Sequence, residues 1–203
     1  CCDPAWKGDD NHQEGSDAAI GCIDIYSIAG QIDCVLLDLS VSNEMESDEG
    51  ADEIQRMMRV WHTNLYSCEQ QADKSMVGLM KRVWKSTPYD ARPAHPPRFI
   101  DVKSWNKRAK NDRISTIAGQ AKMGHWYYLT TIRPQPLGVL KTTVSEYPAS
   151  VKRDTLDMMA QACADEILAR WVPVAVPEQE MPKEDEMPMT YVTRYTGLPV
   201  LLH

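Results

Sequence analysis

The chain of 203 residues lacks several features that would each indicate a protein class directly. It has no run of about 18 consecutive apolar residues, so a membrane-spanning helix is not expected. Its N-terminus lacks the basic-then-apolar order of a secretory signal, which favours a soluble, intracellular protein. No two of its six cysteines have the CxxC spacing of a zinc site, so they are expected to be reduced, mostly structural thiols.

Charge is present but unevenly distributed. The net charge is −7, which by itself argues against a nucleic-acid partner. Residues 1–54 hold fourteen acids and one Lys, whereas residues 81–113 hold ten Lys or Arg against three Asp, a local balance of +7. An acidic centre beside a basic flank is typical of a metal-assisted nuclease, although a polarised, solvated surface would have the same composition.

The composition predicts one core followed by a tail. With 43% hydrophobic residues, the chain can build one sizeable core, which we expect within residues 1–171. Residues 172–203 are acidic and interrupted by prolines, as in a linker or docking tail. The apolar segment 197–201 is suited to docking back on the domain or onto a partner.

Hydrophobic periodicity predicts alternating strands and helices. Residues 18–27 and 31–40 have the apolar, β-branched pattern of two antiparallel strands. A first strand ends at Asp3, and its abrupt start indicates a fragment of a longer polypeptide. Further strands are predicted at 63–68, 98–102 and 125–131, and residues 88–97 form a proline-rich connection.

Five helices are expected between and after these strands. The first covers 48–62 with Asp48 as its N-cap, and the second follows from about residue 72. A basic helix covers 105–123 and ends at Gly124, with its Lys and Arg side chains directed outward or near its N-terminal approach. A short helix follows the bend at Pro134 and Pro136, and the last one runs over 151–171.

Short acidic signatures occur at fixed places along this pattern. The sequence motifs, in order, are Asp3-Pro4-Ala5 with Asp17, Glu69 after a short strand, Asn111-Asp112-Arg113-Ile114, Gly124-His125-Trp126, Glu146-Tyr147-Pro148, and Arg153-Asp154-Thr155-Leu156-Asp157. With this order of elements, residues 1–171 resemble the ribonuclease H-like superfamily, and within it the nuclease domain of the large terminase subunit of tailed bacteriophages.

The resemblance implies an α/β fold with a mixed sheet of five to seven strands flanked by helices, followed by a C-terminal extension. It also implies a metal-dependent endonuclease that cuts concatemeric double-stranded viral DNA during genome packaging in the host cytoplasm. In full-length large terminase subunits an ATPase motor accompanies the nuclease, and the portal and the small subunit are partners. No GxxxxGK[ST] phosphate loop occurs here, so the motor itself is not expected in this chain.

The resemblance assigns a ligand set for two Mg²⁺ or Mn²⁺ ions, which prefer oxygen ligands. Asp3 is the expected central ligand, with Glu69 and Asp154 each completing one side. Asp17, Asp157 and Asp10 are candidates for auxiliary roles. The family's last motif usually has two adjacent aspartates where this chain has Arg153 and Asp154, so Asp157 stays an alternative third ligand.

The basic segment supplies the expected DNA contacts, which are Lys103, Lys107, Arg108, Lys110 and Arg113. Trp105, Trp126, Tyr127 and Tyr128 are expected in the core or against the sheet. His12 and His125 have no spacing that argues for catalysis. Two other functions stay open: another ribonuclease H-like nuclease, such as a junction resolvase or a transposase-type enzyme, and a non-catalytic module that binds DNA or a capsid protein.

Overall fold

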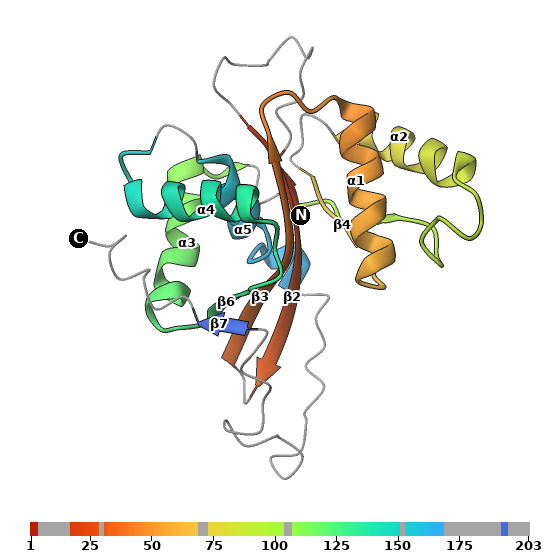
Figure 1. Ribbon diagram of the computed structural model, residues 1–203. Helices are drawn as coiled ribbons and strands as arrows, with labels where there is room; N and C mark the ends of the chain where they lie inside the picture. The colour runs from red at the N-terminus through yellow and green to blue at the C-terminus, as the bar shows by residue number, and fades with distance from the viewer. Residues whose placement is uncertain are drawn as a thin grey trace.

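The computed structural model describes residues 1–3, 17–28, 31–68, 73–103, 107–150, 153–168 and 192–194. These residues form a mixed sheet with helices packed against both of its faces (Figure 1). The predicted α/β class is therefore confirmed. No helix in the described ranges is long and apolar enough to cross a membrane.

The main sheet has the strand order β1-β2-β3-β6-β7. Its strands are β1 (Cys2–Asp3), β2 (Ala18–Ile28), β3 (Gln31–Ser42), β6 (Trp126–Leu129) and β7 (Val192–Arg194). β2 pairs antiparallel with β1 and with β3, which confirms the predicted hairpin. β6 pairs parallel with β3, and β7, from within the predicted tail, pairs antiparallel with β6.

A second, two-stranded sheet consists of β4 (Leu65–Tyr66) and β5 (Arg98–Phe99), which are parallel. A parallel bridge between Cys2 and Cys68 joins it to the main sheet beside β1. Strand β1 therefore lies between β2 and the β4 segment. Because Cys2 immediately precedes Asp3, the end of β1 is a central position in the fold.

The sheet separates two layers of helices, each with its own buried core (Figure 1). One layer contains α1 (Ser47–Val60) and α2 (Asp73–Ser86). The other contains α3 (Lys110–Lys122), α4 (Pro134–Glu146), α5 (Asp154–Gln161) and α6 (Asp165–Leu168). Successive residues of β2 face opposite layers, with Ala19 in the second core and Ala18 and Ile20 in the first.

Helix α5 approaches β2 closely at Gly21. A Cβ atom built on Gly21 would lie 2.5 Å from Met158 Sδ and 3.3 Å from Leu36 Cδ1. Such a distance to Met158 is shorter than any ordinary contact, so the missing side chain at position 21 makes room for the Met158 thioether. Met158 follows Asp157 directly, so this contact also fixes the acidic turn of α5 relative to the sheet.

Several predicted helix boundaries are wrong for local reasons. α1 takes Glu46, not Asp48, as its N-cap, and the Glu46 N–H donates to the Glu49 carboxylate at 3.0 Å. α3 begins at Lys110 rather than at residue 105, because Ala109 is extended. α4 includes Pro134 in its first turn, where a missing N–H costs nothing.

The predicted last helix is broken between α5 and α6. Ala162 N–H donates to Met159 at 3.1 Å and Cys163 N–H to Ala160 at 2.9 Å, so the chain tightens to i→i−3 bonds. Residues 160–164 are all buried, which holds this turn in the core. The six cysteines are free, as predicted, and four of them are buried.

Candidate metal centre

Four aspartates from distant parts of the chain lie together at the end of β1. Asp3 ends β1, Asp17 immediately precedes β2, and Asp154 and Asp157 lie in the first turn of α5. The Lys110 ammonium lies 3.1 Å from Asp3 Oδ2, 2.6 Å from Asp154 Oδ1 and 3.7 Å from Asp157 Oδ2. Asp17 joins them through its backbone, so we call the side chains of Asp3, Asp154 and Asp157, with Lys110 and Arg113, the carboxylate cluster.

Backbone pairing and helix geometry position the acids. The register of β1 on β2 places Asp3 opposite Ala19, two residues after Asp17. The Asp17 N–H donates to Asp154 Oδ2 at 3.1 Å, which ties the start of β2 to the start of α5. Asp154 and Asp157 are three residues apart on one face of α5, near its positive N-terminal end, where carboxylates are favoured.

Arg113 faces into the protein, which corrects the prediction that it points outward. Its guanidinium donates to Asp157 Oδ2 at 2.6 Å, and both side chains are almost fully buried. A buried guanidinium needs a charged partner to offset its lost hydration. Asp157 supplies that partner, so the basic face predicted for α3 turns toward the acids of α5.

Lys110 lies at the N-terminal end of α3, within the predicted alternatives, but its ammonium is directed at the acids. Burial alone lowers the pKa of its ammonium, but Asp3, Asp154 and Asp157 outweigh it and raise the pKa well above its ordinary value. The ammonium therefore stays charged at neutral pH, directed at the carboxylates. Its side chain is still 35% exposed, compared with 8% for Asp3 and 13% for Asp154.

Gln161 links the elements that carry the acids, and the sequence analysis missed it. Its buried side-chain oxygen accepts hydrogen bonds from Cys2 N–H at 3.2 Å and from Ser67 Oγ at 3.0 Å. It thus joins α5 to the residue before Asp3 and to the β4 segment. The spacing of Asp154, Asp157 and Gln161 at i, i+3 and i+7 on one helix face was the signal that could have identified it.

The other predicted site residues are distributed differently. Glu69 and Asp10, like His12 and Trp105, lie outside the described residues. Cys68, next to Glu69 in sequence, forms a backbone β-bridge with Cys2. Lys103, Lys107 and Arg108 are exposed in the segment leading to α3. Lys103 lies 3.0 Å from Asp101, and Arg108 lies 3.8 Å from Asp165.

Arg153 and His125 each form a polar contact outside the carboxylate cluster. Arg153, where the family pattern has an acid, donates through its guanidinium to Asn111 Oδ1 in the first turn of α3. It therefore ties the start of α5 to the start of α3. His125 Nδ1 lies 2.7 Å from Asp33 Oδ1, while Trp126 is buried in the core as predicted.

The donor set of the cluster has the chemistry that a hard divalent cation needs. The three carboxylates of Asp3, Asp154 and Asp157 carry −3 and the two cations +2, which leaves a formal charge of −1. Mg²⁺ and Mn²⁺ prefer such oxygen ligands. Within the described ranges no group of three or more His, Cys, Asp or Glu side chains has metal-binding spacing, and Lys110 takes the central position among three carboxylates.

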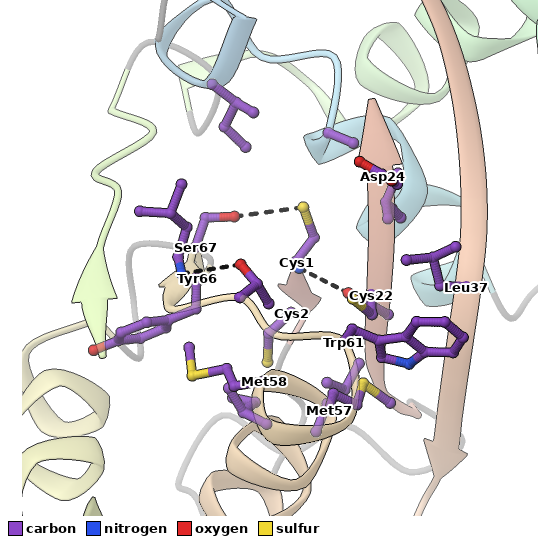
Figure 2. Close-up of a pocket in the computed structure, with 18 of the residues that line it drawn as sticks. Cys1, Cys2, Cys22, Asp24, Leu37, Met57, Met58, Trp61, Tyr66 and Ser67 are labelled. Carbon is purple, nitrogen blue, oxygen red and sulfur yellow. Dashed lines mark hydrogen bonds between the residues drawn. The ribbon is translucent and has the colours of Figure 1, made fainter. Parts of the chain in front are cut away.

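A cavity among the described residues lies away from the carboxylate cluster. It has a volume of about 290 Å³ and lies between β2, α1 and the β4 segment, with Cys1, Cys22, Met57 and Trp61 in its wall (Figure 2). Its lining is mostly apolar, and Asp24 is the acidic residue in that lining. None of the clustered aspartates lines it, so we do not assign phosphate chemistry to this cavity.

The comparisons with known proteins give no relative. No protein-family model matches the sequence, no curated protein is significantly similar to it, and no solved structure is significantly similar to its fold. A functional assignment therefore has to rest on the carboxylate cluster and on the elements that bring it together.

Proposed function

We propose that this chain is a metal-dependent endonuclease of the ribonuclease H-like type, related to the nuclease domain of bacteriophage terminase large subunits. The observation that carries the proposal is the convergence of Asp3, Asp154 and Asp157 on one cationic position. Carboxylates are costly to bury near one another, so their accumulation at one point favours a functional reason.

The arrangement of the strands supports the same proposal. A ribonuclease H-like arrangement has a strand, a hairpin, a helix, a strand, a helix and a strand, with acids at the first strand end, at the later parallel strand end and on the last helix. Here β1 to β5 with α1 and α2 follow that order, and β1 lies between antiparallel β2 and the parallel segment at Cys68. Asp3 and Asp154 occupy two of the three acidic positions, and Glu69 is proposed for the third.

The environment of the two candidate third ligands favours Asp154 over Asp157. Asp157 is almost fully buried and bonded to Arg113, which offsets its charge. Asp154 is more exposed, and its charged contact is with the partly exposed ammonium of Lys110. We therefore propose Asp3, Glu69 and Asp154 as the ligands, with Asp157 holding Arg113 and Asp17 supporting Asp154 through its backbone.

The chemistry divides between the ions and the protein. Two divalent ions about 3.5 to 4 Å apart, when bound, activate a water molecule and neutralise charge on the phosphate. The protein holds the carboxylates at fixed positions through β1 and α5. Lys103, Lys107 and Arg108, exposed beside the start of α3, are proposed to bind DNA phosphates without reading the base sequence.

Incubation of supercoiled plasmid with the protein and Mn²⁺ tests the proposal. We expect nicked and linear DNA with the wild type and a loss of rate of more than about 100-fold for Asp3→Asn, because second-shell changes alone cost 10- to 100-fold at metal sites. Glu53→Gln removes a carboxylate outside the cluster and is the matched control. Nicking by Asp3→Asn at the wild-type rate, or no nicking by any variant over a wide range of metal concentration, would refute it.

A further inference from the structure

The Lys110 ammonium occupies the position among the carboxylates where charge compensation is needed most. It contacts Asp3 and Asp154 at 3.1 and 2.6 Å and lies 3.7 Å from Asp157. At these distances the ammonium occupies the same carboxylate oxygens that a metal ion would use. One set of oxygens cannot hold both cations at once, because two positive charges this close repel strongly.

The exposure of the two cluster cations differs sharply. The Arg113 side chain is 6% exposed and fixed on Asp157, whereas the Lys110 side chain is 35% exposed at the solvent side of the cluster. A lysine has a flexible four-carbon stem, so its ammonium can turn into water without any movement of α3. The Arg113 guanidinium cannot reach water in the same way, because its side chain is buried and bonded to the buried carboxylate of Asp157.

We propose that Lys110 is an internal counter-cation, which holds the carboxylates of the cluster together in the metal-free protein and is displaced from them when a divalent ion binds. The proposal rests on the metal-binding function proposed above. Each divalent ion brings a charge of +2 where the ammonium brings +1, so it compensates the net negative charge of the cluster better. The released ammonium is then free to bind a DNA phosphate, the role expected for Lys110 from the sequence.

Lys110 thus has two effects: it lowers the affinity of the cluster for metal, and it offsets the repulsion among the carboxylates when no metal is bound. A protein with this residue binds metal more weakly than the carboxylates alone would, because the ammonium has to be removed first. It also stays folded without metal. Both consequences can be measured without any DNA or activity.

Titration of the protein with Mn²⁺ tests the proposal, with binding measured by calorimetry and by the EPR signal of the free ion. Lys110→Met removes the ammonium and keeps a long apolar stem, and we expect it to bind Mn²⁺ at least about tenfold more tightly than the wild type. Lys110→Arg keeps the charge and should bind no more tightly than the wild type. Lys107→Met removes an exposed lysine three residues earlier and is the matched control, expected to bind as the wild type does.

The thermal stability of the same proteins gives a second readout. Without metal, Lys110→Met should melt below the wild type, and added Mn²⁺ should reduce or reverse that difference. If Lys110→Met cannot be purified in folded form, Lys110→Gln takes its place in both measurements.

The two proposals can fail separately. Equal or weaker Mn²⁺ binding by Lys110→Met, with binding still lost in Asp3→Asn, would overturn the displacement of Lys110 and leave the metal site in place. Binding of Mn²⁺ by none of these proteins would overturn both proposals.

Discussion

Two groups of charged side chains in this molecule use the same residue types with opposite balance. In the first, which we call the surface network, Arg56 lies 2.6 Å from Asp38 and 2.7 Å from Glu53, and Arg133 lies 2.6 Å from Glu53. Two acids meet two arginines, so the charges cancel. The carboxylate cluster instead has three acids and two cations, in a more buried place.

The two groups differ in how completely their charges are paired. The surface network ties β3 to α1 and to the residue before α4, and every charge in it has an opposite partner within hydrogen-bonding distance. Such half-exposed networks contribute modestly to stability. In the carboxylate cluster the acids outnumber the cations, and because like charges repel, this excess is not expected to add to stability in the same way. It is the feature on which the proposed metal site rests.

Breaking one ion pair in each group should give the largest contrast. Arg113→Met leaves Asp157 buried with Lys110 3.7 Å away, and we expect a loss of about 3 kcal/mol in the free energy of unfolding. Arg133→Met removes an exposed partner and should cost less than about 1 kcal/mol. Urea denaturation of both variants measures the difference, and equal costs would mean that the Arg113 pair is no more demanding than a surface pair.

Added metal should distinguish the two groups next. At 100 times its dissociation constant, Mn²⁺ should stabilise the wild type by about 2.7 kcal/mol through binding to the folded state alone. Asp3→Asn should gain much less, while Asp38→Asn, in the surface network, should gain as much as the wild type. Thermal melts with and without Mn²⁺ measure this, and equal shifts in all three proteins would argue against the site.

The loss of the Gln161 hydrogen bonds should cost less stability than the loss of the Arg113–Asp157 ion pair. Gln161→Met leaves the Cys2 N–H and the Ser67 hydroxyl without this acceptor, and we expect a cost of about 1 to 3 kcal/mol. Gln55→Met is a matched control, since buried Gln55 makes one long bond to Met80 and its Oε1 has no partner among the described residues. Equal costs in urea denaturation would contradict a linking role for Gln161.

The smallest expected effect concerns pH and the surface network. Burial raises the pKa of Glu53, but Arg56 and Arg133 outweigh it and hold the pKa below its ordinary value. A carboxyl group with a lowered pKa stabilises the fold above its unfolded pKa of about 4.3, and the contribution is lost as the pH falls through the folded value.

Glu53→Gln should therefore lower the unfolding free energy at pH 6 and flatten its decline below about pH 4.3. Denaturation curves at a series of pH values measure this change. Curves for the variant and the wild type that run parallel across the whole range would contradict the role assigned to Glu53.

The sequence predicted the parts of this molecule that depend on local pattern. The β2–β3 hairpin follows from alternating apolar residues. The ordered acidic signatures predicted that Asp3 and Asp154, with Asp17 and Asp157 as auxiliary acids, lie close together, and these residues do so in the fold. The sequence did not predict that Arg113 turns inward or that the Lys110 ammonium is directed at the acids, because amphipathic periodicity assigns every cation to the solvent side. Only the long-range partner Asp157, 44 residues away, reverses that assignment for Arg113.

The broken last helix has the same kind of cause. Helical periodicity continues through Cys163 in the sequence, but tertiary packing buries residues 160–164 in a tighter turn. Gln161 shares a helix face with Asp154 and Asp157, but this spacing does not reveal its two distant donors, Cys2 N–H and the Ser67 hydroxyl. Long-range hydrogen bonds and ion pairs therefore determine the helix ends and side-chain orientations that local periodicity does not.

The close contact at Gly21 has a consequence for the distances between the acids. With Gly21→Ala, either the end of the Met158 side chain rotates away or α5 moves outward from β2. An outward movement would carry Asp154 and Asp157, on the preceding turn, away from Asp3. Only the second outcome would change the distances at which Asp3 and Asp154, more than 150 residues apart, share the Lys110 ammonium.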